Sequence, residues 1–154
     1  MTSLCCDVIR RLQGKTLVTA ESLTGGGVGA ALTSVSGSSA VYKGGIISYT
    51  NAVKNRILGV PQEVLDQHGA VSEPVAKAMA EGARLLLEAD ISVSVTGLAG
   101  PGGDEYENPV GTVFIGYSDA DFTEVKHFLF CGDREAIRKQ TAEEALKLVL
   151  KNVK

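Results

Sequence analysis

Residues Ala20 to Gly29 read A-E-S-L-T-G-G-G-V-G, and the rest of the chain is organised around this stretch. It follows a short apolar run, Leu17 to Ala20, which we predict to be a buried strand. It precedes the small apolar residues Val28 to Leu32, which predict the start of a helix. Glycines allow positive φ angles and a close approach of the backbone to a ligand. The stretch therefore predicts a strand that turns sharply into a helix beside a binding site.

The start of this predicted helix could bind an anion. The first N–H groups of a helix are unpaired and carry a partial positive charge, which suits an anion or an oxygen that becomes negative during a reaction. Ser22 and Thr24 add hydroxyl groups there, and Gly25 and Gly26 expose the backbone. The alternative is structural, because a serine or threonine before a helix commonly caps its N–H groups and binds no ligand.

A second glycine-rich loop has the same design. Residues Ile91 to Thr96 alternate apolar and hydroxyl side chains, which predicts a strand. The next residues, Gly97 to Gly103, read G-L-A-G-P-G-G, and Asp104 to Asn108 forms an acidic tip that could close over a ligand. The candidate site residues of this loop are Thr96, Gly97, Gly100 and Gly102.

The remaining elements predict an α/β fold. We expect a helix at 3–13, a strand at 44–49, helices at 52–58, 61–68 and 73–88, strands at 110–117 and 123–130, and a long helix from about residue 134. Alternating helices and strands followed by a hairpin predict a mixed sheet with helices on both faces. Ligands bind at strand ends in such sheets. The length of 154 residues suits one domain, residues 1–154.

Composition narrows the range of partners. A net charge of −3 without a basic block argues against nucleic acid or an anionic membrane as the main partner. No apolar run reaches the length of a membrane span, and the charges at Asp7 and Arg10 interrupt any signal peptide. Three cysteines form no disulfide framework, so we expect a cytoplasmic protein. His68 and His127 lack the spacing of metal ligands, so we expect no metal site.

A serine and a lysine are the candidate reactive pair, because no Ser-His-Asp set is evident. A serine hydroxyl is a weak nucleophile until a base accepts its proton, and a lysine with a lowered pKa can be that base. Ser22 and Lys54 could form this pair, with Tyr49 or Thr96 relaying or orienting the proton. The alternatives place Lys54 on a solvated helix face and Tyr49 in the core.

Two arginines, Arg134 and Arg138, lie one turn apart at the start of the last predicted helix and could bind a phosphate. Together with the serine and lysine they fit hydrolysis of an amide on a phosphorylated small molecule. The G-x-x-x-x-G-K-[ST] phosphate loop is absent, and Gly25 stands where the S-x-x-K signature has its lysine.

Seven blocks occur in order from about residue 5 to 150: A-E-S-L-T-G-G, G-G-I-I-S-Y-T-N-A-V-K, L-G-V, H-G-A-V-S-E-P-V-A, V-T-G-L-A-G-P-G-G, N-P-V-G-T-V and G-D-R-E-A-I-R. Together they resemble the C-terminal domain of the competence/damage-inducible protein CinA. Stand-alone members of that family convert nicotinamide mononucleotide and water to nicotinate mononucleotide and ammonia, without a metal or organic cofactor. The resemblance implies an α/β fold, a three-layer α/β/α sandwich with a mixed, mostly parallel sheet, and it suggests self-association into a homo-oligomer.

The resemblance also implies roles for individual residues. The nucleophile of the E-S-x-T-G-G motif is here Ser22, and the tyrosine and lysine of the Y-x-x-x-x-K stretch are Tyr49 and Lys54. Thr96 matches the threonine before the second glycine loop. The arginine that belongs to the site is either Arg134 or Arg138, and the sequence leaves this choice open.

Two departures from the family pattern bear on function. Asn108 stands where members commonly carry a lysine, and losing that charge would weaken anion binding if the lysine faces the site. Larger members have an N-terminal domain similar to molybdopterin-binding proteins, so we expect this sequence to be the amidase unit alone. Two other functions remain open: a non-catalytic nucleotide- or phosphate-binding regulatory module, and a hydrolase of a related pyridine or pyrimidine nucleotide.

Overall fold

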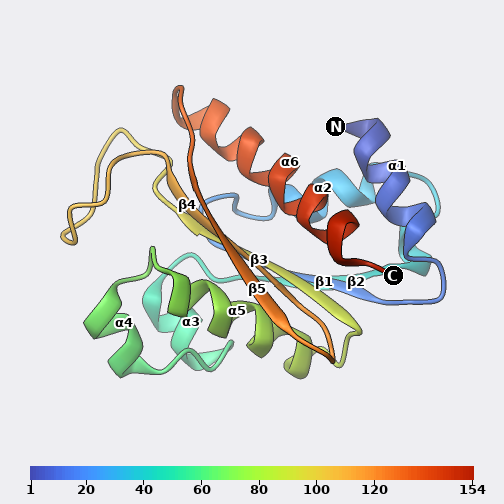
Figure 1. Cartoon of the computed structure of the whole chain (residues 1–154), viewed down its shortest axis with the longest axis horizontal. Helices are drawn as coiled ribbons and strands as arrows, with labels where there is room; N and C mark the ends of the chain where they lie inside the picture. Colours follow the sequence, from blue (N-terminus) through green and yellow to red (C-terminus); the bar gives the residue numbers. More distant parts are fainter.

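A five-stranded sheet lies between two layers of helices in the computed structural model, which describes residues 1–154 (Figure 1). Helices α1, α2 and α6 cover one face of the sheet, and α3, α4 and α5 cover the other (Figure 1). The order of elements is the predicted one and confirms an α/β sandwich. The elements are α1 (Thr2–Arg11), β1 (Leu17–Glu21), α2 (Gly27–Thr33), η1 (Ser38–Ala40), β2 (Tyr42–Ile47), α3 (Asn51–Arg56), α4 (Gln62–His68), α5 (Glu73–Leu86), β3 (Ile91–Gly97), β4 (Thr112–Ser118), β5 (Thr123–Leu129) and α6 (Arg134–Asn152).

The strand order β2-β1-β3-β4-β5 brings the two glycine-rich loops together. Strand β1 pairs in parallel with both β2 and β3, whereas β4 is antiparallel to β3 and to β5. Four of the five strands therefore point the same way, which confirms a mixed, mostly parallel sheet. Because β1 and β3 are parallel neighbours, their carboxyl ends meet at one edge. Ser22 N donates to Val95 O at 3.0 Å, so the first loop starts beside the end of β3.

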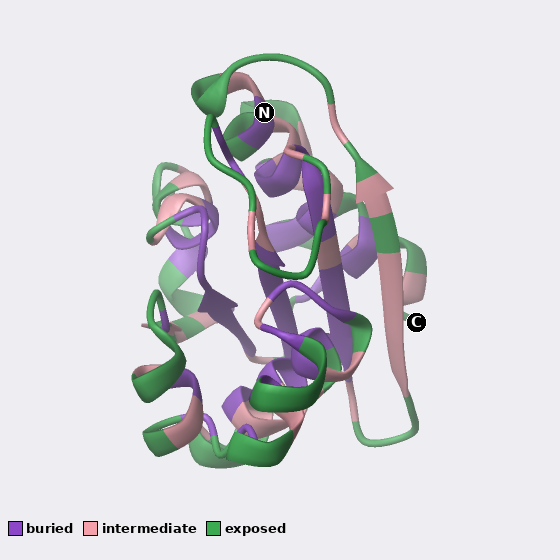
Figure 2. Ribbon diagram, turned by 90° about the vertical axis from the view of Figure 1, so that its left-hand side faces the viewer, coloured by how far each residue is buried: buried purple, intermediate pink, exposed green.

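The core is divided by the sheet into two clusters. The larger has 23 buried residues and includes side chains of α1, α2 and α6, and the smaller has 9 and includes side chains of α5. All five residues of β1 are buried, because both faces of this central strand are covered. Figure 2 shows the central strands buried and the edge strand β5 only partly so. None of the helices is both long and apolar enough to cross a membrane.

One local prediction, the end of β2, differs from the structure. Strand β2 ends at Ile47 instead of residue 49, so Tyr49 lies in the connection to α3. That connection still follows β1, because Ser48 N donates to Glu21 O at 2.7 Å. Ser72 occupies the N-cap position of α5, but its hydroxyl donates to Gly69 O at 2.8 Å and accepts no helix N–H. The hydroxyl therefore holds the preceding turn and does not cap the helix.

Candidate active site

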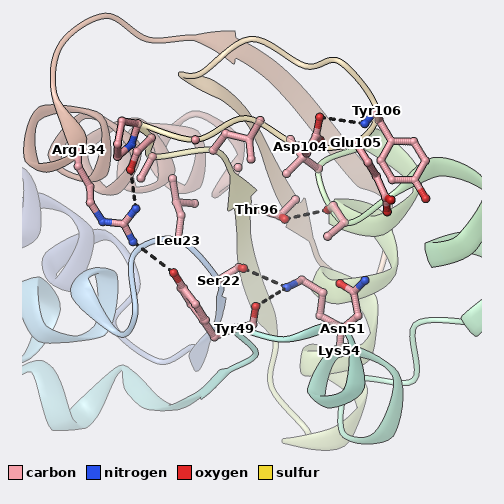
Figure 3. Close-up of a pocket in the computed structure, with 18 residues that line it drawn as sticks. Ser22, Leu23, Tyr49, Asn51, Lys54, Thr96, Asp104, Glu105, Tyr106 and Arg134 are labelled. Carbon is pink, nitrogen blue, oxygen red and sulfur yellow. Dashed lines mark hydrogen bonds between the residues drawn. The ribbon is translucent and has the colours of Figure 1, made fainter.

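Ser22 and Lys54 are in direct contact. Lys54 Nζ donates to Ser22 Oγ at 3.0 Å and to Tyr49 O at 3.3 Å (Figure 3). It also donates to Ser48 O at 2.7 Å. Ser22 follows the last residue of β1, and α3 begins directly after the neighbouring strand β2, with Thr50 as its cap. This connection turns Lys54 back towards the end of β1. Lys54 is only 1% exposed, so the solvated-face alternative is wrong.

The surroundings of Lys54 make its neutral form more accessible than that of a solvated lysine. The four ion pairs of the chain join other side chains, and no carboxylate pairs with this amine. Burial without a counterion lowers the pKa of Lys54 from its ordinary value of 10.5 to about 8. At neutral pH roughly a tenth of the molecules then carry a free amine, and the fraction reaches one half near pH 8. An amine in this range can accept the proton of a neighbouring serine.

A cavity of about 670 Å³ opens beside this pair. Its size falls within the roughly 300–1,000 Å³ of sites that hold small molecules. The second glycine loop, the acidic tip and the start of α6 complete its wall (Figure 3). Eight of the predicted site residues line it: Ser22, Tyr49, Lys54, Thr96, Gly97, Gly100, Gly102 and Arg134.

Neither of the two proposed relay groups stands between serine and lysine. Thr96 Oγ1 donates to Ala70 O at 2.8 Å, and no hydrogen bond joins it to Ser22 or Lys54. The Tyr49 side chain is 57% exposed, so the core alternative is wrong, and its hydroxyl accepts from Arg134 Nη2 at 3.2 Å. The proton can therefore pass directly from Ser22 to Lys54 without a relay.

Four predicted binding residues, Thr24, Gly25, Gly26 and Arg138, are absent from the pocket wall. The reason is Glu21, whose buried carboxylate occupies the start of α2. Oε1 accepts from Val28 N at 2.8 Å and from the Thr24 hydroxyl at 2.6 Å, and Oε2 accepts from Gly29 N at 3.0 Å. The expected anion site is thus filled by an anion of the chain itself.

Glu21 was missed as a functional residue at the sequence level, although a signal was present. It is the one charged residue at the end of an otherwise uncharged strand, six positions before α2. A carboxylate near the start of a helix is stabilised by the helix dipole and the free N–H groups. Sequence reasoning assigned those N–H groups to a ligand and did not consider a side chain as their partner.

The two arginines of α6 hold different loops. Arg134 lines the pocket, where Nη1 donates to Gly100 O at 2.7 Å. Arg138 donates from Nε to Leu23 O at 3.0 Å and from Nη2 to Thr24 O at 3.2 Å. The choice that the sequence left open therefore has a geometric answer: Arg134 faces the cavity, and Arg138 supports the loop after Ser22.

The acidic tip forms one wall of the cavity through Asp104, Glu105 and Tyr106. The Tyr106 hydroxyl donates to Asp66 O at 2.9 Å and so fastens the tip to α4. Asn108 Nδ2 donates to Asp104 Oδ2 at 2.8 Å, and Asn108 is not part of the pocket wall. Asn108, which stands where the family usually has a lysine, therefore stabilises the tip from outside the cavity.

No group of three or more His, Cys, Asp or Glu side chains is arranged to hold a metal ion. The polar groups around the cavity are instead a buried amine, hydroxyls, a guanidinium and glycine backbone, which suit proton transfer and anion binding.

Comparison with known proteins places this fold and site in a family. The family model described as the CinA C-terminal domain matches residues 2–153. The chain belongs to the CinA C-terminal domain family. It is 53% identical over 149 residues to a CinA-like protein of Parasynechococcus marenigrum, covering 94% of this chain and 35% of that protein. A CinA-like protein of Anaeromyxobacter sp. is 49% identical over 144 residues. This CinA domain thus spans about a third of the length of these curated relatives.

Solved structures match the CinA domain over nearly their whole length. A competence-damaged protein (CinA) superfamily protein from Klebsiella pneumoniae is 34% identical with a TM-score of 0.96, covering 99% of this chain and 96% of that one. The competence/damage inducible protein CihA from Agrobacterium tumefaciens is 39% identical with a TM-score of 0.91, covering 97% and 93%. The fold is therefore shared with the solved members of the superfamily.

Proposed function

We propose that this CinA domain is an amidohydrolase that converts nicotinamide mononucleotide and water to nicotinate mononucleotide and ammonia. The observation that carries the proposal is the 3.0 Å contact between Lys54 Nζ and Ser22 Oγ at the wall of the cavity. Burial without a counterion lowers the pKa of Lys54 to about 8, which suits a general base near neutral pH. A serine with such a partner is an activated nucleophile.

The reaction would proceed through an acyl-enzyme. Neutral Lys54 accepts the Ser22 proton as Oγ bonds to the carboxamide carbon, and the carbonyl oxygen becomes an oxyanion. The Lys54 ammonium returns the proton to the amide nitrogen, the C–N bond breaks and ammonia leaves. Water then attacks the ester carbon while Lys54 accepts one of its protons, and that proton returns to Ser22 Oγ as the carboxylic acid product departs and loses its remaining proton to solvent.

Arg134 would bind the phosphate of the substrate. Its guanidinium lines the cavity and uses one nitrogen on Gly100 O and another on the Tyr49 hydroxyl. These contacts hold the planar group in place and leave further N–H donors for an anion, since guanidinium has five. Gly100 and Gly102 on the same wall let the ligand approach the backbone closely.

Replacing Ser22 by alanine tests the reaction directly. We expect S22A to lose ammonia release to the background rate while it still binds nicotinate mononucleotide in calorimetry, since Oγ is the bond-forming atom. Thr33→Ala, at the exposed end of α2 and away from the cavity, is the matched control and should keep full turnover. Ammonia release by S22A at more than about a hundredth of the wild-type rate would reject Ser22 as nucleophile.

A second candidate is a nucleotide- or phosphate-binding regulatory module without catalysis. It is favoured by the mostly protonated state of Lys54 at pH 7, given a pKa of about 8. Calorimetry beside the ammonia assay separates the two, because the module binds nicotinamide mononucleotide without releasing ammonia. If turnover occurs, a panel of pyridine and pyrimidine nucleotides then defines the substrate range.

A further inference from the structure

Glu21 is the only acidic side chain among the buried residues of the chain. It is 2% exposed and makes no ion pair with a lysine or arginine. Its partners are two backbone N–H groups at the start of α2 and the Thr24 hydroxyl. Burying a carboxylate is unfavourable unless such donors compensate it. The buried carboxylate of Glu21 is therefore compensated by donors that belong to the loop around Ser22 and to the helix that follows it.

The carboxylate closes a loop around the nucleophile. Glu21 ends β1 and its partners Val28 and Gly29 begin α2, so the loop that contains Ser22 is pinned at both of its ends. Arg138 holds the middle of the same loop through the carbonyl oxygens of Leu23 and Thr24. Glu21 thus binds N–H donors at the end of this loop, and Arg138 binds carbonyl acceptors in its middle.

Among the N–H groups of the loop that have no acceptor in the chain, that of Leu23 lies at the cavity. Leu23 N donates to no acceptor in the chain, although Leu23 is 4% exposed and lines the cavity next to Ser22. Buried N–H groups without a partner are rare in folded proteins. The N–H of the residue after a nucleophile is also a common oxyanion donor. Thr24 N is unpaired as well, but Thr24 does not line the cavity.

We propose that Glu21 is a positioning residue that, together with Arg138, holds the Ser22 loop so that Leu23 N–H donates to the oxyanion of the tetrahedral intermediate. The inference rests on the proposed amide hydrolysis. In addition, the N–H groups at the start of α2 serve the reaction indirectly, because they bind the buried carboxylate of Glu21.

Glu21→Gln tests the proposal with little change in volume. The amide keeps one acceptor oxygen but turns an NH₂ group towards the donors of Thr24, Val28 and Gly29. We expect kcat to fall by about 10- to 100-fold, short of or equal to the loss of a whole oxyanion donor. KM and the calorimetric affinity for nicotinate mononucleotide should stay within about three-fold, because the cavity wall is unchanged. A kcat within about two-fold of wild type would overturn the proposal.

A matched pair at Thr24 guards against a variant that fails to fold. Thr24→Ser keeps the hydroxyl that donates to Glu21, whereas Thr24→Val keeps the shape and removes it. We expect Thr24→Ser to retain kcat and Thr24→Val to lose about ten-fold, with circular dichroism of both unchanged. Equal kcat values for the two variants would count against a role of this hydrogen bond.

A substrate-independent assay separates this inference from the proposed reaction. A small fluorophosphonate reacts as Ser22 passes its proton to Lys54, Oγ bonds to phosphorus and fluoride leaves. The phosphoryl oxygen of the reagent needs the same N–H donor, that of Leu23. We expect mass spectrometry to show modification of Ser22 in the wild type and a rate lowered about ten-fold or more in Glu21→Gln. If the wild type is modified but releases no ammonia from nicotinamide mononucleotide, the proposed reaction fails and the positioning role stands. No modification of wild-type Ser22, or equal rates in both proteins, would overturn the positioning role.

Discussion

The two glycine-rich loops are similar in sequence but make different contacts in the structure. Each follows a strand of the same sheet and contains several glycines, and a hydroxyl residue lies in the first loop and directly before the second. The first, after β1, wraps around the Glu21 carboxylate and contributes Ser22 and Leu23 to the cavity. The second loop follows β3, and its residues from Gly97 to Gly102 line the cavity.

The difference comes from what each loop encloses. An internal carboxylate accepts from two N–H groups after the first loop and so holds the ends of that loop in place around Ser22. The second loop is followed by no helix, and its main side-chain contact is Gly100 O with Arg134. A glycine loop is thus a ligand site only where no side chain of the protein already satisfies its donors. Under the proposed function, the first loop carries the chemistry and the second binds the substrate.

The largest expected effect concerns Lys54, which contacts Ser22 of the first loop. Lys54→Met keeps most of the side-chain volume but removes the proton acceptor for Ser22. We expect kcat to fall by about 10²- to 10⁴-fold, the usual contribution of a general base. The ammonia assay measures this, and calorimetry with nicotinate mononucleotide checks that the cavity still binds. Activity above about a tenth of wild type would show that another group accepts the proton.

The pH dependence should report the same amine. Because the neutral form of Lys54 is the base and its pKa is about 8, kcat/KM should rise about ten-fold per pH unit below 8 and level off above it. A profile that is flat between pH 6 and 9, roughly, would contradict the assignment.

Stability supplies an independent check of that pKa. Below pH 8 both folded and unfolded chains hold the Lys54 proton, and burying it costs about 3 kcal/mol, from the difference between 10.5 and about 8. Between these values the unfolded chain binds more protons, so this cost is relieved as pH rises. The wild type should therefore gain stability relative to Lys54→Met over this range in denaturant unfolding.

The arginines of α6 offer a sharper contrast between the loops. Arg134→Met removes a cation from the second loop's side of the cavity, so we expect KM to rise about ten-fold with a smaller change in kcat. Arg138→Met leaves the cavity wall intact but frees Leu23 O and Thr24 O, so kcat should fall with little change in KM. Steady-state kinetics on both variants decides this, and the same pattern in both would abolish the distinction between the loops.

The smallest effect is expected at the tip beyond the second loop. Asn108→Lys restores the family's usual residue, but this position lies outside the cavity wall and contacts Asp104. A lysine there would pair with that carboxylate at the surface, which contributes about 0–1 kcal/mol. We expect KM to change by less than about three-fold. A drop of ten-fold or more, roughly, would mean that the lysine reaches the substrate.

Much of the fold and part of the site could be predicted from the sequence. Apolar runs such as Leu17 to Ala20 indicated buried strands, and their alternation with helices indicated a mixed sheet covered on both faces. The end of β2 was misplaced by two residues, because Ser48 and Tyr49 continue an extended pattern without remaining in the ladder. The motif residues Ser22 and Lys54 were identified correctly as neighbours in space.

The predicted binding residues of the first loop that do not line the cavity share a cause. Thr24, Gly25 and Gly26 were assigned to a ligand because a helix start attracts anions, and Glu21 was the nearer anion. A sequence shows which groups need a hydrogen-bond partner, but it leaves open which of the available partners binds them in the fold.

By itself, the sequence determined the order of elements, the two glycine loops and the serine and lysine that meet at the end of β1. Hydrophobic periodicity reports which face of each element is buried, and that suffices to assemble the layers. Only the tertiary structure decided that Glu21 fills the start of α2, that Lys54 is buried without a counterion, and that Arg134 instead of Arg138 faces the cavity. These outcomes depend on competition between donors and acceptors brought together from distant parts of the chain, and that competition is settled by distance and burial in three dimensions.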